Sequence, residues 1–192
     1  MGIVSPAKDG SLLNYILDQQ RPDKDSMSLP LLLDIASNIA QGLEVIHRNK
    51  YVHRDIAARN ILIERKPSGR FNAFICDFGH ACRQGSLDNQ HLATKWSDPY
   101  RLDRPYGPKS DCWSFGVVLW EMMTGRYEPY EDIAPEKVLS KLRKGYRLRV
   151  PDECPKALKD LLISCWHPDL RRRPASTQIC DYLRSLRGLS LS

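Results

Sequence analysis

The sequence predicts a mainly α-helical fold, a helical bundle around one buried central helix with a small β-hairpin beside it. Three observations support this prediction. Most apolar residues recur three or four positions apart, as on one face of a helix. One segment near the middle of the chain is apolar on nearly every side, which is typical of a buried helix. Two short apolar runs flank a turn-like segment, as in a hairpin.

The first long helix is predicted to follow Pro30 and to end near Asn49. Its apolar residues form a stripe down one face: Leu32, Ile35, Ile39, Leu43 and Ile46. The stretch from Gln19 to Ser28 is polar and contains Pro22, so we expect a loop between two helices there.

The hairpin and the central helix come next along the chain. Ile61–Ile63 and Phe74–Cys76 are the two apolar runs, and Pro67–Gly69 is the turn-like connection between them. The buried helix is predicted from Ser110 onward, with Gly125 as its C-cap. Three amphipathic helices are predicted to finish the fold: Pro135–Lys144, Pro155–Cys165 and Ala175–Leu186.

Composition narrows the class of protein. A chain of 192 residues with 42% hydrophobic and 27% charged residues fits one globular domain. No run approaches the ~18 apolar residues of a membrane-spanning helix, so no membrane span is predicted. The six cysteines contain no Cys-x-x-Cys pair and are predicted to be reduced thiols of a cytoplasmic protein. The basic run Arg171–Arg173 is cut by Pro174 and lacks nearby aromatic residues, so no nucleic-acid binding is predicted.

The residues that carry chemistry lie on either side of the hairpin. His53–Asn60 reads His-Arg-Asp-Ile-Ala-Ala-Arg-Asn, and Asp77-Phe78-Gly79 follows the second strand. Phosphoryl transfer needs a group that accepts the substrate hydroxyl proton and oxygen ligands that hold magnesium against the phosphates. Asp55 suits the first task, and Asn60 and Asp77 suit the second.

In this order, the motifs resemble the catalytic loop and the metal-binding segment of protein kinases, with Ile56 where Leu is usual. Ala57-Ala58-Arg59 resembles the tyrosine-kinase form of the loop, since serine/threonine kinases usually carry Lys two residues after the Asp. The resemblance covers nearly the whole chain and implies the fold of a protein-kinase C-lobe. It also implies that Arg59 helps to hold the substrate phenol, and that Asp111 of the central helix braces the backbone of the catalytic loop.

The resemblance implies further roles around the site. The main task of His53 and Phe78 would be packing rather than chemistry. Gly79 completes the Asp-Phe-Gly segment. Arg54 would bind a phosphate on the activation segment. Leu62 would form the floor of the adenine pocket.

The resemblance also implies an organisation of the chain. Residues 1–9 would be the remnant of the last N-lobe strand and the hinge, 10–187 the C-lobe, and 188–192 a short tail. The catalytic loop would be residues 53–60, and the activation segment residues 77–100.

Two departures from the family pattern bear on function. The sequence has no glycine-rich loop and no lysine placed to hold the ATP phosphates, so ATP and Mg are expected only when an N-lobe completes the site. Leu62 and Ile75, on the face that such a lobe would cover, are expected to be open to water.

The second departure is in the activation segment. Tyr100 stands where the family has the glutamate of Ala-Pro-Glu, which pairs with the arginine that matches Arg173. A buried charge without a partner is costly, so we expect Asp98 or Asp103 to compensate.

The activation segment also has no tyrosine between Gly79 and Pro99, so Arg54 lacks its usual phosphotyrosine. Three weaker candidates for modification remain: Ser86, Thr94 and Ser97. His80, directly after Gly79, is unusual for the family.

Three functional hypotheses follow from the sequence. The first is a tyrosine kinase that transfers phosphate from ATP to protein tyrosine when an N-lobe completes it. The second is an inactive pseudokinase or truncated lobe that binds a partner, such as a full kinase. The third is a serine/threonine or dual-specificity kinase, which the Ala57-Ala58-Arg59 run disfavours.

Overall fold

We describe the fold from a computed structural model that covers residues 10–20, 27–86, 95–101 and 105–189. The helices are α1 Leu12–Gln19, α2 Leu29–Arg48, α3 Pro108–Thr124, α4 Pro135–Arg143, α5 Lys156–Cys165 and α6 Ser176–Leu189. The strands are β1 Gly10–Ser11, β2 Tyr51–Val52, β3 Ile61–Arg65, β4 Phe71–Ile75 and β5 Cys82–Arg83. Two short 3₁₀ helices, η1 Ala58–Asn60 and η2 Phe78–His80, lie in the catalytic loop and the activation segment. The mainly α-helical fold is confirmed.

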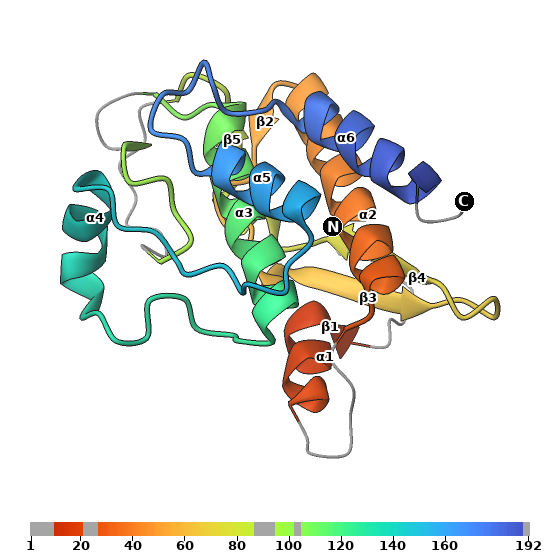
Figure 1. The fold of residues 1–192 in the computed structure, drawn as a ribbon. Helices are drawn as coiled ribbons and strands as arrows, with labels where there is room; N and C mark the ends of the chain where they lie inside the picture. The colour runs from red at the N-terminus through yellow and green to blue at the C-terminus, as the bar shows by residue number, and fades with distance from the viewer. Residues whose placement is uncertain (1–9, 21–26, 87–94, 102–104, 190–192) are drawn as a thin grey trace.

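Helix α3 is the buried centre of the bundle, as predicted (Figure 1). Its N-terminal residues include Pro at one of the first two positions, and Gly125 ends it in the left-handed region with φ 68°. Gly116 lets α5 approach closely, because a Cβ there would lie 2.8 Å from Trp166 Nε1 and 2.9 Å from Cys165 Cβ. Only a residue without a side chain fits this contact.

Helix α2 packs mainly against α6 and strand β4, which lie side by side with it in Figure 1. It begins after Ser28, carries Pro30 near its start, and ends at Arg48 with Asn49 as its C-cap, close to the predicted end. By length and hydropathy α2 could cross a membrane, but half of the relevant window is buried inside the fold. The core helix of a globular protein has the same properties, so the predicted lack of a membrane span stays a prediction.

The hairpin of β3 and β4 is confirmed, with Ile61 opposite Ile75 and Ile63 opposite Ala73. Strand β1 extends it, since Gly10 pairs with Ile63. A second small sheet joins β2 to β5, with Val52 opposite Cys82. These two-residue strands were not predicted, because their pairing joins segments far apart in sequence and leaves no alternating pattern to read.

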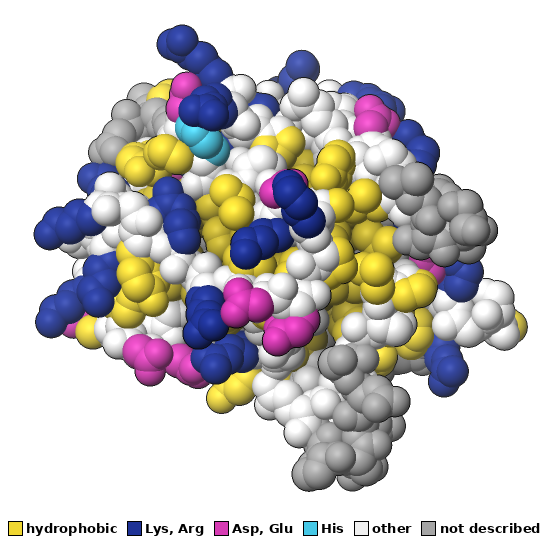
Figure 2. All heavy atoms as spheres, viewed as in Figure 1, with side chains coloured by type: hydrophobic (Ala, Val, Ile, Leu, Met, Phe, Trp, Pro, Cys, Tyr) yellow, Lys and Arg dark blue, Asp and Glu magenta, His cyan; other side chains and the backbone are white. Residues whose placement is uncertain are grey.

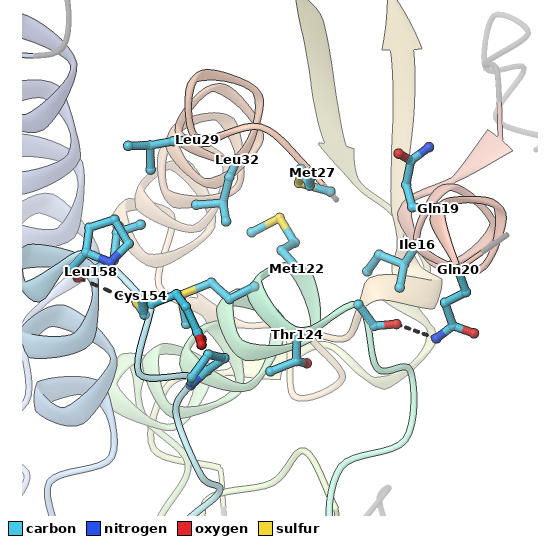
Figure 3. A pocket seen from close by; sticks show the side chains of 15 residues that line it. Ile16, Gln19, Gln20, Met27, Leu29, Leu32, Met122, Thr124, Cys154 and Leu158 are labelled. Carbon is cyan, nitrogen blue, oxygen red and sulfur yellow. Dashed lines mark hydrogen bonds between the residues drawn. The ribbon is translucent and has the colours of Figure 1, made fainter. Parts of the chain in front are cut away.

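A large cavity of about 770 Å³ opens between α1, α2, α3 and the start of α5 (Figure 3). Met27, Leu32, Met122 and Leu158 line it, and beside it Gln20 Nε2 donates to the Gly125 carbonyl oxygen at 2.5 Å. No residue of the catalytic loop lines this cavity.

Charge on the surface follows the composition. Figure 2 shows the face drawn in Figure 1, with Lys and Arg side chains over much of it and hydrophobic side chains exposed near its middle. This fits the net charge of +6. All six cysteines are free thiols, as predicted.

Some predictions fall outside the described residues. These are the assignment of residues 1–9, residues 190–192 of the predicted tail 188–192, residues 21–26 of the predicted loop, and the candidate roles of Thr94 and Asp103.

Candidate active site

Asp111 fixes the backbone of the catalytic loop. Its fully buried carboxylate accepts from the His53 N–H at 2.8 Å through Oδ2 and from the Arg54 N–H at 2.9 Å through Oδ1. His47 Nε2 lies 3.0 Å from Oδ2, and Ser176 Oγ holds the other ring nitrogen of His47 at 2.9 Å. Arg54 takes φ 72°, an unfavourable conformation that the two Asp111 bonds help to maintain. The bracing role that the resemblance implied for Asp111 therefore has direct contacts behind it.

The His53 side chain links the catalytic loop to the start of the activation segment. The Asp55 N–H donates to His53 Nδ1 at 3.3 Å, so Nδ1 is the acceptor and Nε2 carries the proton. That Nε2–H donates to the Cys76 carbonyl at 3.0 Å. Phe78 packs edge-on against the imidazole, with ring centroids 4.9 Å apart. His53 is fully buried, whereas 52% of Phe78 is exposed despite this contact.

The Asp55 carboxylate is held on both sides. Its Oδ1 accepts from Arg59 Nη2 at 2.5 Å, and its Oδ2 accepts from Asn60 Nδ2 at 2.7 Å. Asn60 Nδ2 also donates to the Asp55 carbonyl at 2.8 Å. Only 9% of Asp55 is exposed, so the carboxylate stands in one orientation at the rim of the site. A carboxylate fixed in this way has the geometry that a general base requires.

The residues present suit a magnesium ion bound with nucleotide phosphates. Asn60 uses its amide nitrogen toward Asp55, which leaves its carbonyl oxygen as the group able to bind a cation. Asp77 is exposed and takes the left-handed conformation with φ 60°. Its Oδ1 accepts a hydrogen bond from the Gly79 N–H at 3.3 Å. Asn and Asp oxygens are ligands that magnesium prefers, with water and phosphate completing the shell. Among the described residues there is no cluster of three or more His, Cys, Asp or Glu side chains able to hold a metal alone.

The face above the hairpin is only partly covered by the described residues. Leu62 and Ile75 are half-buried, so they are less open than expected. Phe74 and Phe78 are the more exposed aromatic residues, at 39% and 52%. An apolar surface of this kind suits the floor of an adenine pocket or a covering domain.

Arg54 has partners that the sequence did not reveal. Its Nε donates to the His80 carbonyl, and its guanidinium lies 4.9 Å from the centre of the Tyr106 ring. Tyr106 is also bonded through its backbone to Gly85 and Ser86 of the activation segment, at 2.8 and 3.1 Å. The unmodified chain thus supplies contacts for Arg54 and for this part of the segment.

Asp98 compensates for the missing glutamate. Arg173 Nη1 donates to Asp98 Oδ2 at 2.8 Å and Nη2 donates to Oδ1 at 3.0 Å, with both side chains fully buried. Arg173 also donates to the carbonyls of His167 and Lys109, and lies over the Trp113 ring. The expectation that one of two aspartates replaces the glutamate is confirmed for Asp98.

Glu121 is a residue of the site that sequence reasoning missed. It lies on α3, is 1% exposed, and its Oε2 accepts from the Ala58 N–H of the catalytic loop at 3.2 Å. Burial raises the pKa of this carboxyl to about 7, and Trp96, the Ala58 N–H and the Arg59 charge offset part of that rise. A carboxylate in the middle of the apolar run of the central helix was the signal that could have drawn attention to it.

We expect a Glu121→Gln substitution to stabilise the protein above neutral pH. The unfolded carboxyl ionises near its usual pKa of 4.5 and the folded one near 7, so between these values the folded state binds more protons. The stability of the wild type therefore falls as pH rises through this window. The stability of the Gln variant does not, because its amide does not titrate. At pH 8 the variant should be more stable by up to about 3 kcal/mol, and at pH 4 by little. Urea unfolding at both pH values checks this, and an equal effect at the two would contradict it.

Comparison with known proteins agrees with the geometry. The chain matches the family described as protein tyrosine and serine/threonine kinase over residues 1–183. It is 36% identical to the megakaryocyte-associated tyrosine-protein kinase of Mus musculus over 99% of this chain, and 36% identical to the Rattus norvegicus protein of the same name over 99%. It is 34% identical to the tyrosine-protein kinase TXK of Homo sapiens over 90%.

The chain spans only part of these relatives, namely 37%, 40% and 32% of their lengths. The family match covers the catalytic loop, the Asp77 segment and both residues of the buried Asp98–Arg173 pair. The chain belongs to the protein tyrosine and serine/threonine kinase family.

Proposed function

We propose that this chain is the substrate-binding C-lobe of a protein tyrosine kinase, a transferase that moves the γ-phosphoryl group of ATP to a protein tyrosine. The observation that carries the proposal is the orientation of Asp55 by Arg59 and Asn60 on a loop fixed by Asp111. In this proposal residues 10–187 form the lobe, and an N-lobe outside them supplies the glycine-rich loop and the phosphate-binding lysine.

The residues take the following tasks. Asp55 accepts the proton of the substrate hydroxyl, and Arg59 holds the phenol next to it. Asn60 and Asp77 bind magnesium, which neutralises charge on the phosphates when it is present. Leu62 forms the floor of the adenine pocket. The buried pair of Asp98 and Arg173 keeps the end of the activation segment in place.

Tyrosine as the acceptor is supported by two findings. The relatives named above are tyrosine-protein kinases by name. The Ala57-Ala58-Arg59 run has the tyrosine-kinase form of the loop, and Arg59 contacts the proposed base at 2.5 Å. We further propose protein substrates, a cytoplasmic location, and neither nucleic-acid binding nor a membrane span.

The test is a transfer assay on the protein that carries this chain together with an N-lobe. With labelled ATP, Mg²⁺ and a tyrosine-containing protein, we expect labelled phosphotyrosine that disappears when EDTA removes the metal. Phosphoserine or phosphothreonine as the product would contradict the tyrosine assignment. A protein with an intact N-lobe that transfers nothing would contradict the enzyme and favour a partner-binding lobe.

A further inference from the structure

A small cavity of about 200 Å³ lies beside the catalytic loop, on the side of Arg59. It is lined by side chains from α1, the catalytic loop, the activation segment, α3 and the loop after α3: Leu13, Arg59, Lys95, Trp96, Glu121, Tyr127 and Glu128. Lys95 and Glu128 pair with each other at 2.6 Å, and Arg59 pairs with Asp55. Glu121 is the buried carboxylate among these lining residues. Its contacts with the catalytic loop and with Trp96 indicate its role.

The first contact of Glu121 is with the start of η1. A helix leaves its first N–H groups without partners inside the helix, and a side chain just before it usually accepts from one of them. Ala57, at that position in η1, makes no such bond. Glu121 Oε2 accepts from the Ala58 N–H instead, at 3.2 Å. Helix α3 thereby caps the turn of the catalytic loop that runs from Ala58 to Asn60.

The second contact is with the platform under Arg59. The Arg59 guanidinium lies 4.6 Å from the centre of the Trp96 ring, and so stacks on it. Trp96 and Glu121 line the same cavity, and the buried Trp96 indole N–H makes no hydrogen bond within the described part of the chain. Glu121 therefore contacts the backbone one residue before Arg59 and lies close to the ring on which Arg59 rests.

The two contacts converge on one side chain. Arg59 has a 34% exposed side chain and bonds to Asp55 at 2.5 Å, so its direction depends on the turn that carries it and on Trp96. We propose that Glu121 is a positioning residue, which sets the place of Arg59 by capping the Ala58 turn and bordering the Trp96 ring. This inference rests on the proposed function, in which Arg59 holds the phenol of the substrate.

Hydrogen exchange of backbone amides tests the proposal without any need for activity. The variants are Glu121→Leu, which removes the acceptor, and Glu121→Gln, which keeps one. The controls are the amides of His53 and Arg54, which α3 also holds, but through Asp111. In Glu121→Leu we expect exchange at Ala58 to rise about three- to tenfold while the control amides stay within about twofold. In Glu121→Gln, measured at pH 4 where this substitution is expected to change stability little, all three amides should stay near wild type.

Two results would overturn the proposal. One is an unchanged Ala58 amide in Glu121→Leu. The other is an equal rise at Ala58, His53 and Arg54, because it would show a general loss of packing rather than a local cap.

A kinetic measurement on the protein with its N-lobe adds the link to substrate. Glu121→Leu should raise KM for the tyrosine substrate about tenfold and leave KM for ATP unchanged, and Glu121→Gln should restore the substrate KM. Equal increases in both KM values would contradict a role through Arg59. If the wild-type protein transfers no phosphate, the proposed function fails, and the amide exchange still decides whether Glu121 caps the loop.

Discussion

An Asp55→Asn substitution, in a protein that joins this chain to an N-lobe, is expected to slow phosphoryl transfer by about 10²- to 10⁴-fold. The amide cannot accept the hydroxyl proton. It also places an N–H₂ group against either Arg59 or Asn60, both of which donate to Asp55 in the wild-type site. The expected loss is in kcat, because Asp55 is proposed to accept the proton during the transfer step itself. Initial rates at saturating ATP and Mg²⁺ measure it.

The matched control is Asp132→Asn, which makes the same chemical change on an exposed residue between α3 and α4. It should leave the rate within about twofold of wild type, since substitutions on the exposed surface, away from the core and the site, have small effects. A loss of less than about tenfold in Asp55→Asn would show that Asp55 is not the base. A melting temperature close to wild type would confirm that the loss is not caused by unfolding.

An Asp98→Asn substitution is expected to lower the free energy of unfolding by about 3–5 kcal/mol. It removes one partner of a fully buried pair and leaves Arg173 with a charge that no solvent can reach. Urea unfolding of the wild type and the variant measures the difference. The effect should be visible without nucleotide, because the pair lies within the described fold.

The control for this prediction is an exposed pair on α6. Asp181 accepts from Arg184 at 2.8 Å, with 74% and 68% of the two side chains exposed. Asp181→Asn should change the free energy of unfolding by less than about 1 kcal/mol. A similarly small effect at Asp98 would contradict the view that it replaces the family glutamate. Adding Tyr100→Glu to Asp98→Asn should recover part of the stability, since it returns a carboxylate to the usual place.

Much of the fold could be predicted because its signals are local. Helix α3 is apolar on nearly all sides, and the structure buries it almost completely. The hairpin was readable from two apolar runs and one turn between them. The catalytic loop and the Asp77 segment were readable because their order along the chain is itself the signal.

What the sequence could not predict depends on contacts between distant segments. It could not choose between Asp98 and Asp103, because the choice depends on which carboxylate reaches Arg173 across the fold. The sequence suggested no partner for Arg54, because its actual partners, a backbone carbonyl and the Tyr106 ring, form no recognisable motif. It also passed over Glu121, whose partner is a backbone N–H with no sequence signature.

The size of the native protein tests most directly whether this lobe works as part of a kinase. An immunoblot with an antibody against the C-terminal helices would report it. The account predicts a band at least ~9 kDa heavier than the 22.0 kDa of this chain, which allows an N-lobe at roughly 110 Da per added residue. A single band at 22.0 kDa would contradict the account, because Asp55, Asn60 and Asp77 would then have no partner lobe to bring ATP to them.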